Sequence, residues 1–163
     1  MRVLALDLGG KRIGVAISDE LGFLARALTT VHRRNRNADM AALAALVLGE
    51  GAGLVVIGLP LHLNGDLGRE AEKAQKFGAI LAAHIAVPIT FWDERLTTVE
   101  AARLLAEAGV SPKKARLQID AAAAAVLLQS YLDSHSSMRS GYYDPEREQW
   151  LPYPEALPAP LLS

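Results

Sequence analysis

The chain has 163 residues, contains no cysteine and carries a formal net charge of −1. This length suits one domain with a sizeable core, and the apolar half of the composition can fill that core. A chain without cysteine has no disulfides and no cysteine-ligated zinc, which favours a reducing compartment. A net charge near zero argues against a histone-like nucleic-acid binder, but it leaves room for a local basic groove.

The N-terminal stretch MRVLALDLGG lacks the long uncharged apolar run of a signal peptide. No segment of the sequence approaches the roughly 20 consecutive apolar residues of a membrane span. We therefore expect a soluble, cytoplasmic protein that makes no contact with a membrane.

The first third of the chain predicts three closely spaced strands. VLALDLG (3–9) is apolar on both faces and is typical of a central strand. A tight GGK turn leads into IGVAIS (13–18), and the DELG turn leads into a third strand, FLARALTTV (23–31). Short turns between neighbouring strands predict an antiparallel meander.

Helices then alternate with strands. Helical spacing predicts a helix in ADMAALAALVLGEG (38–51), capped by Asn37 or Asp39 and ended by Gly51. The pattern continues with a strand at 53–60, a helix at 69–85, a strand at 87–92 and a helix at 97–109. A short helical turn at 113–117 and a last helix at 119–133 complete the pattern. Alternation of this kind predicts parallel strands with right-handed crossovers.

This order of elements predicts an α/β fold: a mixed five-stranded sheet, with three antiparallel strands followed by parallel ones, flanked by helices. We expect one domain over residues 1–133 and a C-terminal tail over 134–163. The tail holds five of the eight prolines together with several aromatic residues, and no hydrophobic period is visible in it. It therefore predicts little regular structure.

Carboxylates recur at the ends of the predicted core elements. Asp7 lies near the end of the first strand, Asp93 and Glu94 follow the last strand, and Asp120 opens the last helix. Active sites of open α/β sheets form at the carboxyl ends of parallel strands. Like charges gathered there are most readily stabilised by a divalent cation, and oxygen ligands without His or Cys favour magnesium or manganese.

Each acid could also have a purely structural role. Asp120 alone could cap its helix or interact with the helix dipole, and Asp93 and Glu94 could form a turn paired with Arg95. Asp7 is harder to explain structurally, because a carboxylate within a buried strand needs a partner.

Four stretches of the sequence carry a resemblance to a known family. LALDLGGKRIGVAISD, VVIGLPLHLNGD, FWDERLTTVEA and QIDAAAAAVLLQSYL are similar, in this order, to motifs of the YqgF/RuvX family of RNase H-like nucleases. Gly10 and His62 depart from the residues that are common in that family, and the tail is longer than in typical members. The resemblance implies an RNase H-like fold and a metal-dependent phosphodiesterase, a hydrolase linked to 5′-end processing of precursor 16S ribosomal RNA in ribosome biogenesis.

The resemblance also implies roles for individual residues. It assigns the catalytic and metal-binding acids to Asp7, Glu94 and Asp120, with Asp93 as the fallback ligand. Two ions of magnesium or manganese would clamp the phosphodiester, one activating water and the other stabilising the leaving oxygen. The expected substrate contacts are Lys11, Arg12, Asn64 and Arg95.

Several alternatives stay open at this point. Within nucleases, the chain could be a Holliday junction resolvase or a general DNA or RNA nuclease, and it could be a monomer or a homodimer, the latter suiting junctions. The partner would be RNA, or branched or single-stranded DNA. LDLGGKRIGVAIS also resembles the first phosphate loop of actin-like ATPases, but those enzymes need about twice the chain. A nucleic-acid-binding protein without catalysis is the remaining class.

Three basic clusters could serve nucleic-acid binding, although each taken singly is typical of a solvated surface. They consist of Lys11 and Arg12; Arg33, Arg34 and Arg36; and Lys113, Lys114 and Arg116.

Overall fold

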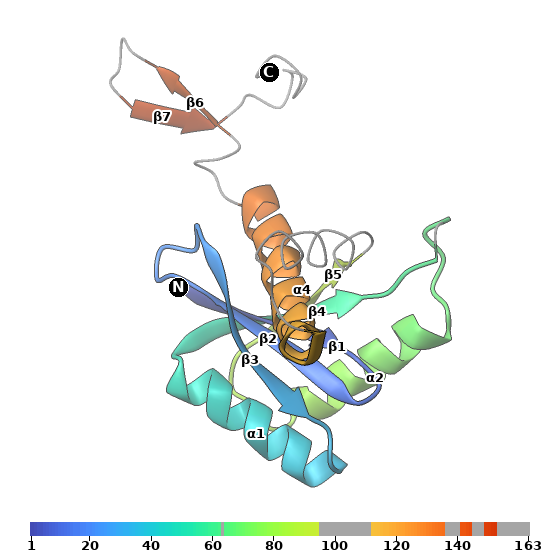
Figure 1. Cartoon of the computed structure of the whole chain (residues 1–163). Helices are drawn as coiled ribbons and strands as arrows, with labels where there is room; N and C mark the ends of the chain where they lie inside the picture. Colours follow the sequence, from blue (N-terminus) through green and yellow to red (C-terminus); the bar gives the residue numbers. More distant parts are fainter. Residues whose placement is uncertain (63, 95–111, 136–140, 145–148, 153–163) are drawn as a thin grey trace.

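The structure, a computed structural model, describes residues 1–62, 64–94, 112–135, 141–144 and 149–152. Its centre is a five-stranded sheet in the order β3-β2-β1-β4-β5 (Figure 1). The predicted mixed sheet of three antiparallel and two parallel strands is confirmed.

The antiparallel half consists of β1 (Arg2–Leu8), β2 (Arg12–Ser18) and β3 (Ala25–His32). In the register of β1 with β2, Asp7 lies opposite Gly14. The parallel half adds β4 (Ala52–Leu59) beside β1, and β5 (Ile89–Asp93) beside β4. The carboxyl ends of β1, β4 and β5 therefore meet at one edge of the sheet, which we call the carboxyl edge.

Two helices cover one face of the sheet: α1 (Arg36–Gly49) and α2 (Arg69–Ala82). Side chains alternate between the two faces along each strand, and most of the large aliphatic ones point to this face. Leu4 and Leu6 of β1 pack there with Leu43 of α1 and Leu81 of α2 in one fully buried cluster. This cluster forms the larger part of the core.

The opposite face is covered by α4 (Pro112–His135) (Figure 1). Small side chains dominate its contact with the sheet, among them Ala5 of β1, Ala16 of β2 and Ala124 of α4, all fully buried. Small residues let the helix backbone lie close to the strands. Leu127 and Leu128 fill the remaining space in the same cluster.

Two features of the helices differ from the sequence predictions. The cap of α1 is Asn35, whose side chain accepts a hydrogen bond from the Ala38 N–H, instead of Asn37 or Asp39. Asp39 is buried and accepts a hydrogen bond from the Arg34 N–H. The predicted turn at 113–117 and helix at 119–133 form the single helix α4, while the helix predicted at 97–109 lies outside the described residues.

Some regular structure is described in the segment for which the sequence predicts little. α4 continues to His135, across the boundary that the sequence predicts after Asp133. Beyond it, β6 (Gly141–Asp144) and β7 (Gln149–Pro152) pair as an antiparallel hairpin, drawn apart from the main sheet in Figure 1.

Among the described helices, none is both long enough and apolar enough to cross a bilayer.

Candidate functional site

Strand periodicity directs Asp7 toward the face covered by α4. Val3 and Ala5 of β1 pack in the α4 cluster, and Asp7 is the next residue in the same alternation. Asp7 is half-buried at the carboxyl edge, where β1 leads into its turn with β2. The opening residues of the chain thus bring one carboxylate to the end of an otherwise apolar strand.

Glu94 reaches the same place from β5. Its backbone N–H donates to the Leu59 carbonyl at 3.3 Å, which continues the pairing of β5 with β4 by one residue. Trp92, two residues earlier, packs in the α4 cluster, so Glu94 also points to the α4 face. A Cβ added at Gly58 of β4 would overlap the Glu94 carboxylate and lie 3.2 Å from Leu127 Cδ2. The glycine at position 58 therefore leaves the space that this carboxylate occupies.

Asp7 and Glu94 are joined by a hydrogen bond between their carboxyl groups. Burial raises the pKa of Glu94 to about 8, and the neighbouring charges of Asp7 and Asp93 contribute to that rise. Burial also raises the pKa of Asp7, against the effect of the Glu94 hydrogen bond, and the charge of Asp120 adds to the rise. Two carboxyl groups forced together in this way share a proton near neutral pH.

Asp120 belongs to α4 and lies on the β2 side of Asp7, whereas Glu94 lies on the β4 side. A Cβ added at Gly14, the residue paired with Asp7 on β2, would overlap the Asp120 carbonyl. Only glycine lets the α4 backbone come this close to the strand pair. The Asp120 carboxylate accepts a charge-assisted hydrogen bond from Arg12 Nε at 2.5 Å.

The donor set suits a hard divalent cation. Asp7 and Glu94 present carboxylate oxygens only, and magnesium is commonly held by one or two carboxylates plus water and substrate phosphate. The Asp7–Glu94 pair meets that need. No group of three or more His, Asp or Glu side chains is arranged to hold an ion in the part of the chain that the structure describes. Asp120 therefore stands beside the pair as a third acid, bound to Arg12.

The other predicted site residues occupy different positions. Lys11 is exposed in the β1–β2 turn, and Asn64 binds Asp66 within the loop after β4, with its Nδ2 donating at 3.0 Å. Asp93 ends β5, and Glu94 is the residue that bonds to Asp7. Arg95 lies outside the described residues.

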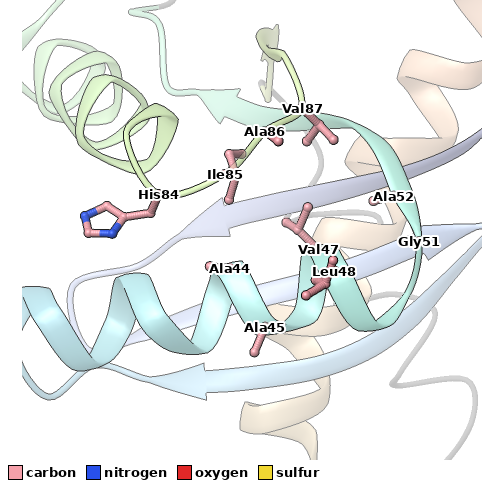
Figure 2. Close-up of a pocket in the computed structure, with 10 residues that line it drawn as sticks. All are labelled: Ala44, Ala45, Val47, Leu48, Gly51, Ala52, His84, Ile85, Ala86 and Val87. Carbon is pink, nitrogen blue, oxygen red and sulfur yellow. The ribbon is translucent and has the colours of Figure 1, made fainter.

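A separate pocket of about 530 Å³ lies at the opposite edge of the sheet (Figure 2). It is formed by the C-terminal half of α1 and by residues 84–87, which precede β5. Its lining is almost entirely apolar, with His84 at one end, as Figure 2 shows. Without a carboxylate among its lining residues, this pocket does not offer the chemistry of the acidic site.

Sequence reasoning missed three features of the site: the glycines at 14 and 58 and the Arg12–Asp120 ion pair. A glycine inside a strand pattern signals close approach of another backbone, so the first two carried a usable signal. The ion pair joins residues 108 positions apart in the chain. No local pattern reports a contact at that separation.

Comparison with known proteins places this chain in a family. Residues 1–134 match the family model described as "RuvX: Holliday junction resolvase". A relative from Moorella thermoacetica is 50% identical over 133 residues, which cover 82% of this chain and 95% of that protein. One from Geobacillus kaustophilus is 47% identical over 136 residues, covering 82% and 99%. Both are named "Putative pre-16S rRNA nuclease".

Solved structures support the fold. Thermus thermophilus RuvC in complex with a Holliday junction substrate aligns with a TM-score of 0.53 at 16% identity, covering 82% of this chain and 95% of that one. The Fowlpox virus resolvase, also with junction DNA, aligns with a TM-score of 0.53 at 14% identity, covering 82% and 98%. The match over residues 1–134 and the identity to these curated relatives establish that the chain belongs to the RuvX family.

Proposed function

We propose that this protein is a divalent-metal-dependent nuclease that hydrolyses phosphodiester bonds and processes the 5′ end of precursor 16S ribosomal RNA. The observation that carries the proposal is the hydrogen-bonded Asp7–Glu94 pair with Asp120 beside it, in a chain of the RuvX family. The names of the curated relatives favour ribosomal RNA as the substrate. A role on ribosomal RNA would place the activity in the cytoplasm.

Asp7 and Glu94 are the proposed ligands of magnesium or manganese, and Asp120, held beside them by Arg12, is the third acid that the family resemblance assigns to a two-ion site. Bound there, the ions would supply water activation and charge stabilisation at the leaving oxygen. Glu94, with a pKa of about 8, holds a proton at neutral pH that it shares with Asp7. These carboxyls must be deprotonated to act as ligands, so ion binding is coupled to proton release.

Arg12 and Lys11 have different proposed tasks. Arg12 balances the charge of Asp120 through its 2.5 Å contact and holds that carboxylate next to Asp7. Lys11, exposed in the turn four residues after Asp7, is placed to meet substrate phosphates. We retain Asn64 and Arg95 as proposed substrate contacts on the grounds of the family resemblance.

The test is a cleavage panel in magnesium and in manganese. Wild type and Asp7→Asn are incubated with single-stranded RNA, single-stranded DNA, duplexes and four-way junctions. We expect wild type to cleave single-stranded RNA only when the divalent ion is present, and Asp7→Asn to lose at least about 10²-fold in rate, by analogy with the loss of one electrostatic catalytic group. No cleavage of any substrate by wild type would refute the proposal.

Junction resolution is the second candidate, because the family description names that activity. It would appear as paired cuts in the four-way junction, and it needs a symmetric dimer that brings two sites together. An actin-like ATPase is not favoured, since the match to the RuvX family covers residues 1–134.

A further inference from the structure

A basic pocket lies between the start of α1 and the first half of α2. Its volume is about 310 Å³, and its lining includes four cationic side chains and one carboxylate. The cations are Arg33, Arg36, Lys73 and Lys76. In a chain of net charge −1, such a concentration of positive charge stands out as a candidate anion site.

Arg33 gives the pocket a fixed donor. Its guanidinium carbon lies 5.3 Å from the centre of the Phe77 ring, a cation–π contact that holds the group in place. Its Nε is buried and has no hydrogen-bond acceptor among the described residues. A buried guanidinium nitrogen without an acceptor costs free energy, and an anionic oxygen would satisfy it.

The other charged residues that line the pocket belong to α1 and α2. The carboxylate of Asp39 is buried and accepts a hydrogen bond from the Arg34 N–H, which ties the first turn of α1 to the residues before it. Lys73 pairs with Glu70 at 3.2 Å on the exposed surface of α2, whereas Lys76 is an exposed cation on the next turn. The N-terminus of α1 also faces this region, and its dipole favours negative charge.

The pocket is connected to the candidate active site through the backbone. The Arg33 N–H donates to the Lys11 carbonyl at 2.9 Å, which ties the pocket to the β1–β2 turn. Lys11 is four residues from Asp7, so the Cα atoms of the two lie at most about 14 Å apart. The Asp7–Glu94 pair lies on the α4 face and the basic pocket on the face covered by α1 and α2, with exposed Lys11 in the turn between β1 and β2 at the carboxyl edge.

We propose that this pocket binds backbone phosphates of the single-stranded RNA substrate, outside the nucleotides that are cleaved. The inference rests on the proposed nuclease function and adds a second anchoring point to it. Phosphate contacts position a strand without reading its sequence, so binding here should not depend on base identity.

Binding of labelled RNA 16-mers in chelator tests the pocket independently of cleavage. The variants are Lys76→Glu, Arg36→Glu and Arg33→Ala, with Arg26→Glu as the matched control. Arg26 is an exposed arginine near the opposite end of β3, 4.0 Å from Glu50. We expect Lys76→Glu and Arg36→Glu each to weaken binding of adenine-rich and uracil-rich strands equally, about five- to tenfold. The slope of log affinity against log salt should fall by about 0.7 for each lost phosphate contact.

Arg33→Ala removes a partly buried side chain, so its melting curve is recorded first, and the exposed variants decide the question if it is unstable. Affinities and salt slopes equal to those of Arg26→Glu would overturn the inference. A wild type that binds the 16-mer through the pocket but cleaves nothing in magnesium would refute the nuclease proposal alone. A wild type that cleaves normally while the pocket variants bind unchanged would refute the pocket alone.

Discussion

Glu94 and Asp7, the proposed metal ligands, occupy positions that are unfavourable for the fold when both are charged. Both carboxyls have raised pKa values because the fold buries them beside each other. A raised pKa means that the folded protein binds a proton more tightly than the unfolded chain does. The free energy of unfolding should therefore be highest where Glu94 is protonated, and it should decline as the pH rises.

The predicted loss of stability covers a defined pH range. Below the ordinary pKa of 4.5 the full stabilisation is present, and it is lost between there and about pH 8, the folded value. In chelator, wild type should thus be more stable at pH 5 than at pH 8. Glu94→Gln, which stays neutral, should show a flatter pH dependence and melt no lower than wild type at pH 8. Urea unfolding at the two pH values measures the free energy of unfolding. The same change between pH 5 and pH 8 in wild type and in Glu94→Gln would contradict the prediction.

Arg12 and Lys11 are adjacent in sequence but should differ in effect. Lys11→Ala should weaken RNA binding and lower the salt slope by about 0.7, with little change in stability, because Lys11 is exposed. Arg12→Ala should in addition lower the melting temperature, because Asp120 loses its 2.5 Å partner while remaining beside Asp7. Melting curves in chelator separate the two residues. An Arg12→Ala variant as stable as Lys11→Ala would show that the ion pair contributes nothing.

At the scale of elements, the packing of α4 against β2 positions Asp120. We predict that Gly14→Ala costs about 1–3 kcal/mol, since the new methyl group overlaps the Asp120 backbone and α4 must shift. The melting temperature should fall by about 2–4 °C for each kcal/mol, and cleavage should slow because Asp120 moves with the helix.

Gly10→Ala is the matched control, because a Cβ at Gly10 meets nothing within 4 Å. Both changes add the same methyl group within five residues of the chain. Equal melting temperatures for the two variants would contradict the close-approach account of Gly14.

Most of the elements were predictable, because their signals are local. Ile13, Val15 and Ile17 alternate with small residues in the sequence and form one buried face of β2. The cap of α1 was not predictable, since Asn35, Asn37 and Asp39 are all good caps and tertiary packing selects among them. The β6–β7 hairpin consists of four-residue strands in a proline-rich segment, where periodicity carries little information.

The candidate site was predictable only in part, because local signals place its acids but do not report its long-range contacts. Each acid stands at the end of a predicted element, and the rule for parallel strands brings Asp7 and Glu94 to one edge. The pairing of Arg12 with Asp120 depends on how α4 crosses β2, which no local pattern encodes. Arg12 was therefore predicted as a phosphate contact alone.

At the scale of the whole molecule, the proposed boundary between domain and tail belongs after His135. The last turn of α4 is held by aromatic contacts: the rings of Tyr131 and His135 stack with their centres 4.1 Å apart, and each is T-shaped relative to the ring of Trp92. Trp92 also donates a hydrogen bond to Ser130 at 3.0 Å. Residues through 134 suffice for the family match.

A chain that ends at His135 should consequently keep its fold and its metal-dependent cleavage. We predict a melting temperature within about 2–4 °C of the full chain, the equivalent of about 1 kcal/mol. The full-length protein is the control. A substantially larger drop, or loss of cleavage with the fold intact, would assign residues 136–163 to the functional unit.

The central claim is that Asp7 lies in its strand because it binds a divalent ion there. Calorimetric titration of manganese into wild type tests this most directly, with Asp7→Asn and the exposed-acid control Glu20→Gln beside it, each with and without a hydrolysis-resistant RNA strand. Wild type and Glu20→Gln should bind the ion. The RNA should tighten binding of the ion, and the ion should tighten binding of the RNA by the same factor. Asp7→Asn should bind the ion far more weakly in both conditions. Identical titrations for wild type and Asp7→Asn, with and without the strand, would contradict the claim.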